Sequence, residues 1–506
     1  MGVIADVVGG STPRTDDPTN WEPAMIPWVT PADLSGYTKK TISHGRRFIS
    51  EKGLNTSGAR LLPAGTVLFS SRAPIGYVAI AANPLATNQG FKNFVLNGRI
   101  LPDYIYYYLV GNKHLALELA GGTTFAEISG KKAAEIPVCI PPLAEQDRIV
   151  GALEELFSKL DAAVTALERV RANLKRYRAS VLKAACEGRL VPTEAELARR
   201  EGRDYEPADV LLDRILKERR ARWEAEEWAR LRAQGKEPKD DRWKRRYKEP
   251  QPPDTSGLPE LPEGWVWASI EQLGQVIGGI TKNRQRGRLP LKVPYLRVAN
   301  VYANELRLDD IEEIGVTETE LQRVLLCPGD LLIVEGNGSR DQIGRVALWD
   351  GSIYPCAHQN HLIKIRLIEK DIAHYVLYWL LSPLGRSVIE DLASSTSGLY
   401  TLSLSKVAAV PVPLPPTSER HRIIDEVESR ISLLDSIAGS IEVQFNRAHR
   451  LRQSILKRAF EGRLVPQDPS DEPASVLLER IRAERDSVAR SGRKRRGPTK
   501  VAAVPQ

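Results

Sequence analysis

The residues that come nearest to a chemical site are Cys356, His358 and His361, which stand close together in one short stretch. Thiolate and imidazole groups are ligands that Zn²⁺ prefers. On a strand, however, His358 and His361 point to opposite faces, and the next such ligand is the distant His374. The matching segment of the first half, residues 88–91, contains neither Cys nor His. We therefore interpret the cluster as a polar loop or strand and expect no metal site.

The sequence also lacks the motifs of a self-sufficient enzyme. It contains no P-loop, no Gly-rich dinucleotide fingerprint and no HExxH. The Asn-Pro-Pro-aromatic loop typical of DNA amino-methyltransferases is missing, because Pro141 and Pro142 follow Ile140 and begin a helix. The sequence contains no acidic pair followed by Glu-x-Lys, which is the pattern that would suggest a nuclease. We predict that no residue of this chain is catalytic and that the protein is not an enzyme.

The composition limits the class of protein and the cellular compartment that the sequence is compatible with. The 506 residues suffice for two or three domains, and the net charge of +8 is compatible with a nucleic-acid partner. The four cysteines are far apart without a CxxC, which favours a reducing compartment. No apolar run reaches the length of a membrane span, and the N-terminus lacks the pattern of a secretion signal. These features predict a cytoplasmic protein without a membrane partner.

The element that must position any binding residues is a long helical stretch that occurs twice. Residues 141–192 align without a gap on residues 415–466, with 22 of 52 positions identical. Each copy begins with a Pro pair, and Glu145 or Glu419 falls in its first turn, where a carboxylate suits the helix dipole. Each copy ends at a Gly, Gly188 or Gly462, with a Pro four residues later, which is a usual helix exit. The stretch is therefore an internal duplication.

Each copy carries a row of mostly apolar residues at intervals of seven. A second row, three residues after the first, completes the a/d seam in copy one, whereas Arg430, Gln444 and Arg458 interrupt it in copy two. Neither helix can bury its row alone, so we predict that the two helices pack on each other. The alternative is two unrelated surface helices, each lying on its own domain. The predicted interface residues of the first row are Leu153, Leu160, Leu167, Leu174, Val181, Val427, Leu434, Ile441 and Ile455.

Two mixed α/β segments precede the two helices and resemble each other. Residues 1–140 form the first, with a short strand expected at Ile136–Ile140, and residues 263–414 form the second. Ser71 and Arg72 align with Ser339 and Arg340, but the second domain's loop before the Ser-Arg pair is four residues longer. A repeated frame with different loop tips is expected when one scaffold carries two recognition surfaces.

The remaining segments are extensions of the duplicated unit. Residues 193–262 read as a charged helical extension followed by a Pro-rich linker. A smaller repeat matches residues 206–215 to residues 472–481, so the duplication extends past each long helix. Residues 467–506 read as a short helix and a basic tail, which we expect to be disordered from Arg490 onward.

The combination of these motifs resembles the specificity subunit of Type I restriction–modification systems. Pro-Pro-x-x-Glu-x-x-Arg-Ile at 141–149 and 415–423 looks like that family's entry to its helical regions, and both helices end in Glu-Gly-Arg-Leu-Val-Pro. Leu-Pro-Glu-Gly-Trp-Val-Trp at 261–267 looks like the opening of its second domain. The first domain has no such opening, so either an N-terminal strand is missing or the true start lies upstream.

The resemblance implies an α+β fold with two globular target-recognition domains and two long helices packed as an antiparallel coiled coil. It implies a non-catalytic, sequence-specific double-stranded-DNA-binding subunit, in which each domain reads one half of a bipartite asymmetric site. The helices would dock two methyltransferase subunits, which use S-adenosylmethionine, and restriction subunits, which use ATP and Mg²⁺. This chain would bind no cofactor itself. The alternative is a tandem-domain binding or scaffold protein with a non-DNA ligand on the same spacer.

Reading bases requires hydrogen-bonding side chains on loops, supported by phosphate contacts. Arg72 and Arg340 stand out because both domains keep an Arg at one frame position. For each candidate, an ordinary solvated surface residue is the alternative. The first domain's candidates are Thr12, Lys39, Lys40, Arg46, Arg47, Ser71, Arg72, Asn88, Gln89, Thr123 and Thr124. The second domain's candidates are Lys282, Arg284, Arg286, Asn337, Ser339, Arg340, Gln359, Asn360, Ser395 and Thr396.

Overall fold

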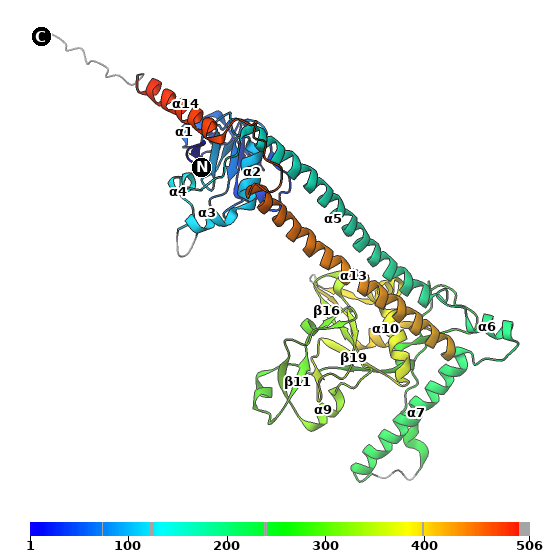
Figure 1. The fold of residues 1–506 in the computed structure, drawn as a ribbon. Coiled ribbons are helices and arrows are strands. Elements are labelled where there is room, and N and C mark those ends of the chain that lie inside the picture. Colours follow the sequence, from blue (N-terminus) through cyan, green and yellow to red (C-terminus); the bar gives the residue numbers. More distant parts are fainter. Residues whose placement is uncertain (73, 122–125, 237, 239, 397–398, 495–506) are drawn as a thin grey trace. The chain divides into compact units, whose positions relative to one another are not determined.

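The computed structural model describes residues 1–494 except 73, 122–125, 237, 239, 397 and 398 (Figure 1). The chain divides into two compact units. The first unit comprises Met1–Glu168 with Glu442–Gln506, and the second comprises Arg169–Ile441. Each unit therefore contains one mixed α/β domain, part of each long helix and one copy of the shorter helical extension.

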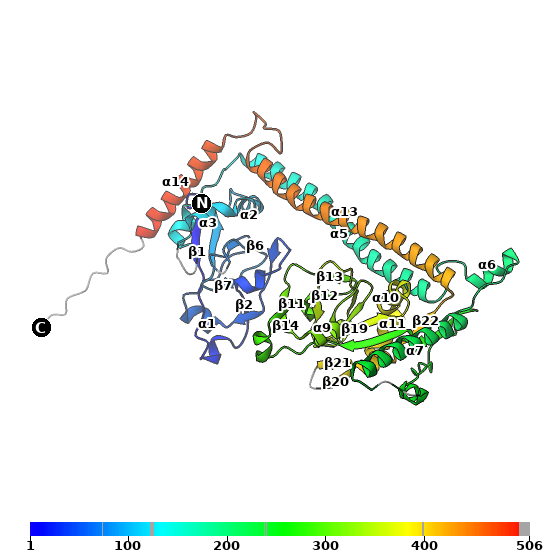
Figure 2. The same ribbon diagram turned by 90° about the horizontal axis from the view of Figure 1, so that it is seen from below.

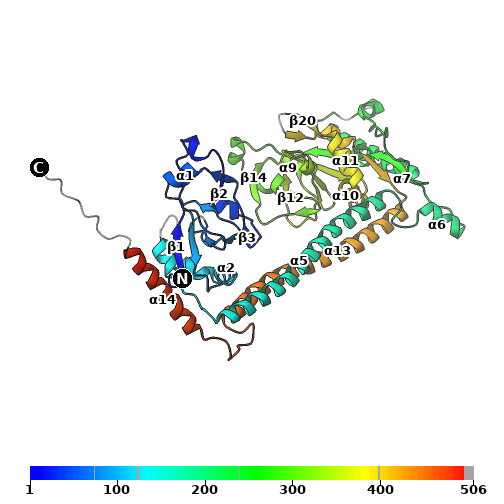
Figure 3. The ribbon, with the colours of Figure 1, turned by 90° about the horizontal axis from the view of Figure 1, so that it is seen from above.

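The two long helices are α5 (Leu143–Cys186) and α13 (Thr417–Phe460), of 44 residues each. At 1.5 Å per residue each is about 65 Å long. They lie side by side in every view (Figures 1, 2 and 3). This confirms the prediction of two mixed domains with two long helices packed against each other.

Cross-helix ion pairs define the direction of packing. In the second unit, Arg178 of α5 pairs with Asp435 of α13. In the first unit, Asp161 of α5 pairs with Arg452 of α13, whose guanidinium also lies 4.5 Å from the ring centre of Phe157. Higher numbers on one helix meet lower numbers on the other, so the helices are antiparallel.

The first apolar row of each helix is buried or half-buried. On α13, Val427, Leu434, Ile441 and Ile455 are buried. On α5, the ends of the row are buried and its middle is half-buried. The buried members on α5 are Leu153 and Val181, and the half-buried members are Leu160, Leu167 and Leu174.

The second row of the seam differs from the expectation. Val170 and Tyr177 of α5, and Ile437 and Leu451 of α13, occupy the expected row and are all exposed. The row that accompanies the first lies four residues after it, not three. Positions three and four residues away both neighbour a residue on a helix surface, and the row four residues after the first is the more buried one at most positions of both helices. In copy two that row holds Ile431, Ala438 and Phe445, which are half-buried, instead of Arg430 and Gln444.

The first domain is built on a five-stranded sheet with two apolar faces. Because side chains alternate along a strand, Val67 and Phe69 face a core shared with the helices, whereas Leu68 faces a second core with Val29 and Leu34. The strands in spatial order are β1 (Ala5–Gly9), β8 (Lys92–Leu96), β5 (Val67–Phe69), β6 (Val78–Ala81) and β3 (Thr41–Ile42). A smaller sheet contains β4 (Arg47–Ile49), β2 (Ile26–Val29) and β7 (Ala86–Thr87), and the helices are α1 (Glu51–Thr56), α2 (Pro102–Gly111), α3 (Lys113–Leu119) and α4 (Gly130–Ala134).

The second domain repeats this arrangement. Leu331 and Ile333 face the core shared with the helices, and Leu332 and Val334 face a separate core around Trp349. Its main sheet has the order β10 (Gly274–Gly278), β19 (Leu362–Leu367), β15 (Leu331–Val334) and β17 (Val346–Leu348). Smaller sheets contain β14 (Glu312–Val316), β11 (Leu291–Leu296) and β18 (Ala357–His358), and β16 (Gly336–Asn337), β21 (Leu399–Thr401) and β20 (Ser394–Thr396). The helices beside the sheet include α10 (Ala373–Leu381) and α11 (Pro383–Leu392).

The strand expected at Ile136–Ile140 does not form within the described residues. Its counterpart in the second domain, β22 (Pro411–Leu414), pairs antiparallel with β9 (Val266–Ser269). A strand requires a partner for its hydrogen bonds, and no described residue of the first unit pairs with Val138 or Ile140. The prediction was therefore wrong because it considered the segment without the neighbour that makes it a strand.

The shorter extensions pack on the domain of their own unit. Helix α7 (Ala208–Ala233) follows α6 (Glu194–Glu201) and donates a hydrogen bond of 3.2 Å from Arg222 to the carbonyl of Ile368. Helix α14 (Ala474–Lys494) runs beyond Arg490, further than expected, and residues 495–506 lie outside the described part of the chain. None of the described helices is long and apolar enough to cross a lipid bilayer.

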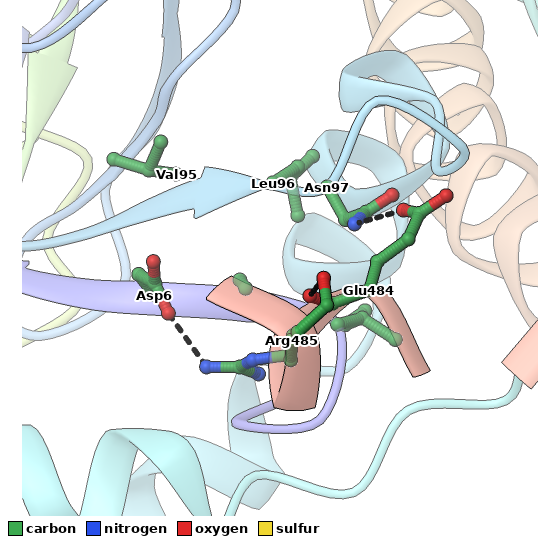
Figure 4. A pocket seen from close by; sticks show the side chains of 9 residues that line it. Asp6, Val95, Leu96, Asn97, Glu484 and Arg485 are labelled. Atoms are coloured by element: carbon green, nitrogen blue, oxygen red, sulfur yellow. Dashed lines mark hydrogen bonds and ion pairs between the residues drawn. The ribbon is translucent and has the colours of Figure 1, made fainter. Parts of the chain in front are cut away.

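Helix α14 is fixed to the first domain by side chains that also line a pocket. Figure 4 shows Arg485 pointing to Asp6, with a separation of 2.6 Å, and Glu484 meeting Asn97. Arg485 also donates to the backbone carbonyl of Val3 at 2.9 Å. The last described helix of the chain thus holds the residues near Met1.

Candidate nucleic-acid interface

One end of the first domain's sheet gathers the loops that carry several predicted residues. The backbone N–H of Ser11 donates to the backbone carbonyl of Thr87 at 2.9 Å, and the backbone N–H of Ser71 donates to the backbone carbonyl of Gly90 at 2.7 Å. The hydroxyl of Thr12 donates to the side chain of Gln89. The loops that follow β1 and β5 and the loop that precedes β8 therefore form one surface.

A charged cluster lies on the same surface. Arg72 and Lys92 approach the carboxylate of Glu127 at 3.9 and 3.7 Å, and Lys92 donates to the hydroxyl of Ser71 at 3.5 Å. The side chains of Arg72 and Glu127 are 39% and 44% exposed. Both remain accessible to a ligand, and in water such long ion pairs are weak enough to exchange for other partners.

The equivalent end of the second domain's sheet gathers the corresponding loops. The backbone N–H of Ile280 donates to the backbone carbonyl of His358, and the backbone N–H of Asn360 donates to the backbone carbonyl of Ile280, both at 2.9 Å. Glu335 directly follows β15, and its backbone N–H donates to the backbone carbonyl of His361 at 2.9 Å. The imidazole of His361 also lies 3.2 Å from the carboxylate of Glu335.

Arg340 stands at this end among carboxylates, as Arg72 does in the first domain. Its guanidinium lies 3.4 Å from Glu390 and 3.2 Å from Asp391, and its side chain is exposed. The side-chain oxygen of Asn337 accepts the N–H of Ser339 at 3.0 Å, which shapes the loop. The frame position is thus shared, while the residues around it differ between the two domains.

The structure brings about half of the predicted residues to these two ends. Asn88 is half-buried and caps its loop by accepting the N–H of Gly90 at 2.9 Å, and Gln359 is also half-buried. The predicted residues that gather at these ends are Thr12, Ser71, Arg72, Asn88 and Gln89 in the first domain, and Asn337, Ser339, Arg340, Gln359 and Asn360 in the second.

Other predicted residues of the first domain have different environments. Lys40 forms ion pairs with Asp103 of α2 and Glu154 of α5, within the body of the unit. Arg47 stacks on the indole of Trp21, with its guanidinium 3.6 Å from the ring centre. Lys39 and Arg46 are exposed, and the Arg46 side chain is 85% exposed.

In the second domain, Arg286 is 15% exposed and donates to both carboxylate oxygens of Glu320, at 3.1 and 2.9 Å. Burial of this kind suits a structural role. Lys282 pairs with Glu312 at 2.8 Å, and Arg284 is exposed. Thr123 and Thr124 lie outside the described residues. Ser395 and Thr396 lie in β20.

Lys92, Glu127 and His361 join these surfaces although the sequence did not single them out as DNA contacts. Lys92 is the first residue of β8 and directly follows the loop that contains Asn88. Its position in the repeated frame could therefore have indicated that it belongs to this surface. Glu127 reaches the cluster from a distant segment through a backbone bridge to Arg72. No local sequence pattern indicates such a contact.

The Cys356–His361 stretch separates into a core and a surface part. His358 is fully buried in β18, where its ring nitrogens lie 3.1 and 3.4 Å from the carbonyl oxygens of Val324 and Ile277, and burial lowers its pKa to about 4. His361 is exposed. Within the described residues, no group of three or more His, Cys, Asp or Glu side chains is placed to hold a metal ion.

Paired, non-identical loop surfaces on a duplicated frame, joined by an antiparallel helix pair, define a tandem recognition protein. The family model for the Type I restriction modification DNA specificity domain matches residues 2–170 and 262–442. The chain belongs to this family and is a non-catalytic DNA specificity subunit with two target-recognition domains.

Individual relatives agree with this assignment. The Type I restriction enzyme EcoKI specificity subunit of Escherichia coli is 28% identical over 380 residues, which cover 72% of this chain and 68% of that protein. The MjaIX specificity subunit of Methanocaldococcus jannaschii is 43% identical over 153 residues, but the match spans only 35% of its length. A solved structure described by the assembly and conformational transition of a Type I restriction–modification system shares the fold, with a TM-score of 0.55 at 15% identity over 91% of this chain and 96% of that one.

Proposed function

We propose that each domain reads one half of a bipartite, asymmetric DNA site through the loops at the end of its main sheet. The observation that carries the proposal is the position shared by Arg72 and Arg340, each exposed beside carboxylates at the same end of equivalent sheets. The surrounding residues differ between the domains, so the two halves of the site differ as well.

The residue types at these ends suit the edges of base pairs. An arginine can donate two hydrogen bonds to guanine, and Asn or Gln can pair similarly with adenine. In the first domain Arg72 and Gln89 offer these groups, and in the second Arg340 and Gln359 do so. The neighbouring carboxylates orient the arginines in the free protein and can be exchanged for DNA acceptors, since exposed ion pairs are worth little.

Two methyltransferase subunits are the expected partners of the helix pair. Val170 and Tyr177 of α5, and Leu433 and Ile437 of α13, are 37–63% exposed although they lie on helices in contact with each other. A row of exposed apolar residues is suited to bind further helices. S-adenosylmethionine would bind to the methyltransferase subunits, and ATP and Mg²⁺ to restriction subunits. The complex would act in the cytoplasm.

The test uses the chain co-purified with its methyltransferase subunits. Duplexes selected from a random library should share two short conserved blocks separated by a spacer of unspecified sequence. Affinity should fall steeply as salt is raised, because phosphate contacts release counterions. A complex that selects no sequence and shows no salt-dependent binding would instead support the alternative of a scaffold with a non-DNA ligand.

A further inference from the structure

One arginine of the first domain is packed against tryptophan but is bonded to no acceptor. The guanidinium carbon of Arg47 lies 3.6 Å from the ring centre of Trp21 and 5.6 Å from that of Trp28. Arg47 is exposed, and none of the described residues forms a hydrogen bond or an ion pair with its guanidinium. Stacking uses the face of the guanidinium plane and leaves the N–H donors along its edge. These donors are therefore oriented by the indoles and remain open to a ligand.

The two tryptophans are themselves fixed to the loop that follows β1. Their rings meet edge to face, with centres 5.4 Å apart and planes at 83°. The indole N–H of Trp28 donates to the backbone carbonyl of Ser11 at 3.0 Å, and the indole N–H of Trp21 donates to the backbone carbonyl of Arg14 at 3.1 Å. Ser11 belongs to the loops that gather at one end of the main sheet. The indoles thus place Arg47 beside the surface that we propose to read the first half-site.

The second domain carries a different kind of group at the corresponding position. In the strand registers, Trp28 lies opposite Arg47 as Tyr295 lies opposite Glu312, and each central residue pairs with an alanine on its other side. The carboxylate of Glu312 accepts the hydroxyl of Tyr295 at 3.0 Å and the ammonium of Lys282 at 2.8 Å. The second domain therefore has an internally paired carboxylate where the first domain has a guanidinium open to solvent.

A preoriented guanidinium beside a DNA-reading surface fits the phosphodiester backbone. The N–H donors of a guanidinium match phosphate oxygens, and such pairs are strong because both groups are charged. Phosphate contacts fix the register of a protein on the duplex, which favours donors whose position is set before binding. Arg47 lies in β4 of a sheet and not at a loop tip. Its position is therefore suited to a contact that DNA of every sequence offers.

We propose that Arg47, oriented by Trp21 and Trp28, binds a backbone phosphate next to the half-site that the first domain reads. The contact anchors the first domain on the duplex without reading a base. The second domain makes no equivalent contact at Glu312, so this anchor is present on one side of the bipartite site. The inference rests on the proposed function, because it requires that the loops at the sheet end face DNA.

The first test measures Kd for the complex with methyltransferase subunits on the selected duplex over a range of salt concentrations. Arg47→Ala should weaken binding by roughly tenfold at low salt and reduce the salt slope by about 0.9, the value for one phosphate. The loss should be equal on all single-base variants of the site. The matched control Arg482→Ala removes the same charge from an exposed position of α14, which contacts Asn97 at the opposite end of the sheet, and should change neither quantity.

Two further measurements locate the phosphate and test the role of the indole. Replacing single phosphates with uncharged methylphosphonates should reproduce the loss at a position beside the first half-site, and there Arg47→Ala should have no further effect. Trp21→Ala should weaken binding several-fold, and the double variant should bind as Arg47→Ala alone does, because Trp21 acts through Arg47. Trp21→Phe keeps an aromatic face and should bind as the parent does.

The outcomes separate this proposal from the proposed function. If the complex selects a bipartite site but Arg47→Ala leaves Kd and the salt slope unchanged, the phosphate contact is wrong and the proposed function stands. A loss confined to one base position would also overturn the proposal, because Arg47 would then read a base. Additive losses in the double variant would contradict the positioning role of Trp21. A parent complex that selects no site would overturn both proposals.

Discussion

Replacing Arg72 with alanine should impair recognition of one half-site and leave the fold intact. The guanidinium of Arg72 lies 3.9 Å from Glu127, and the side chain is 39% exposed. An exposed pair of this kind contributes at most about 1 kcal/mol to stability. Lys92 remains 3.7 Å from Glu127 in the variant, so the carboxylate keeps a cation nearby. The Tm should therefore change little.

The expected loss in binding is larger than the loss in stability. A bidentate contact between arginine and guanine discriminates against other bases by about 1–3 kcal/mol, which corresponds to roughly 5- to 150-fold in Kd. The loss should occur on duplexes that carry the preferred base at one position of the first half-site. On duplexes already changed at that position, the variant and the parent should bind alike.

The assay measures Kd for the purified complex on a panel of single-base variants of the selected site. Arg60→Ala is the matched control, because it removes the same charge from the same domain at an exposed side chain that is not among the predicted DNA contacts. If Arg72→Ala weakens all duplexes equally and flattens the salt dependence, Arg72 contacts phosphate and the base-reading argument is refuted.

Three further predictions follow from the second unit. Arg340→Ala should weaken binding in the same range but only through the other half-site, measured on the same panel. Leu434→Ala, which opens a cavity between the long helices, should lower the free energy of unfolding by about 2–5 kcal/mol. The control Leu433→Ala removes a side chain that is 63% exposed and should change it by less than about 0.5 kcal/mol. Both values are measured by urea titration. Burial raises the pKa of Glu419 from 4.5 to about 7, so its contribution to stability is fully present below pH 4.5 and is lost as pH rises through about 7. Glu419→Gln should therefore flatten the fall in stability between pH 5 and 8, and an unchanged pH profile would contradict this.

The long helices could be predicted because their signal is local and repeated. Leu153 and Val181 belong to a row sustained over the whole helix, and such a row has few uses other than a helix partner. Local sequence could not decide whether the second row is the one that contains Val170 or the one that contains Val164. Both rows neighbour the first row on the helix surface. In the structure Val164 is half-buried and Val170 is exposed.

The frame of the recognition surfaces was likewise accessible from the sequence. The alignment of the two domains put Arg72 and Arg340 at one position, and the structure has them at equivalent ends of the two sheets. Their carboxylate partners come from segments far away in the sequence, so no spacing indicated Glu127. Residue type alone also could not separate an exposed Arg284 from Arg286, which is bound to Glu320.

The segment Ile136–Ile140 illustrates the limit of propensity. Its residues 137–140 align with β22 and begin with the same Pro-Val, and its β-branched residues favour a strand, yet it remains irregular in the absence of a partner. Local sequence specifies what a segment can form, and its neighbours decide whether it does.

The most direct test of modular reading is a loop exchange in the second domain. Residues 335–342, which contain Asn337 and Arg340, are replaced by the corresponding first-domain loop in the complex with methyltransferase subunits, and bound duplexes are selected from a random library. The account predicts that one half of the selected site changes and that the other half and the spacer stay the same. A change in both halves, or an unchanged site, would contradict the conclusion that each domain reads its own half.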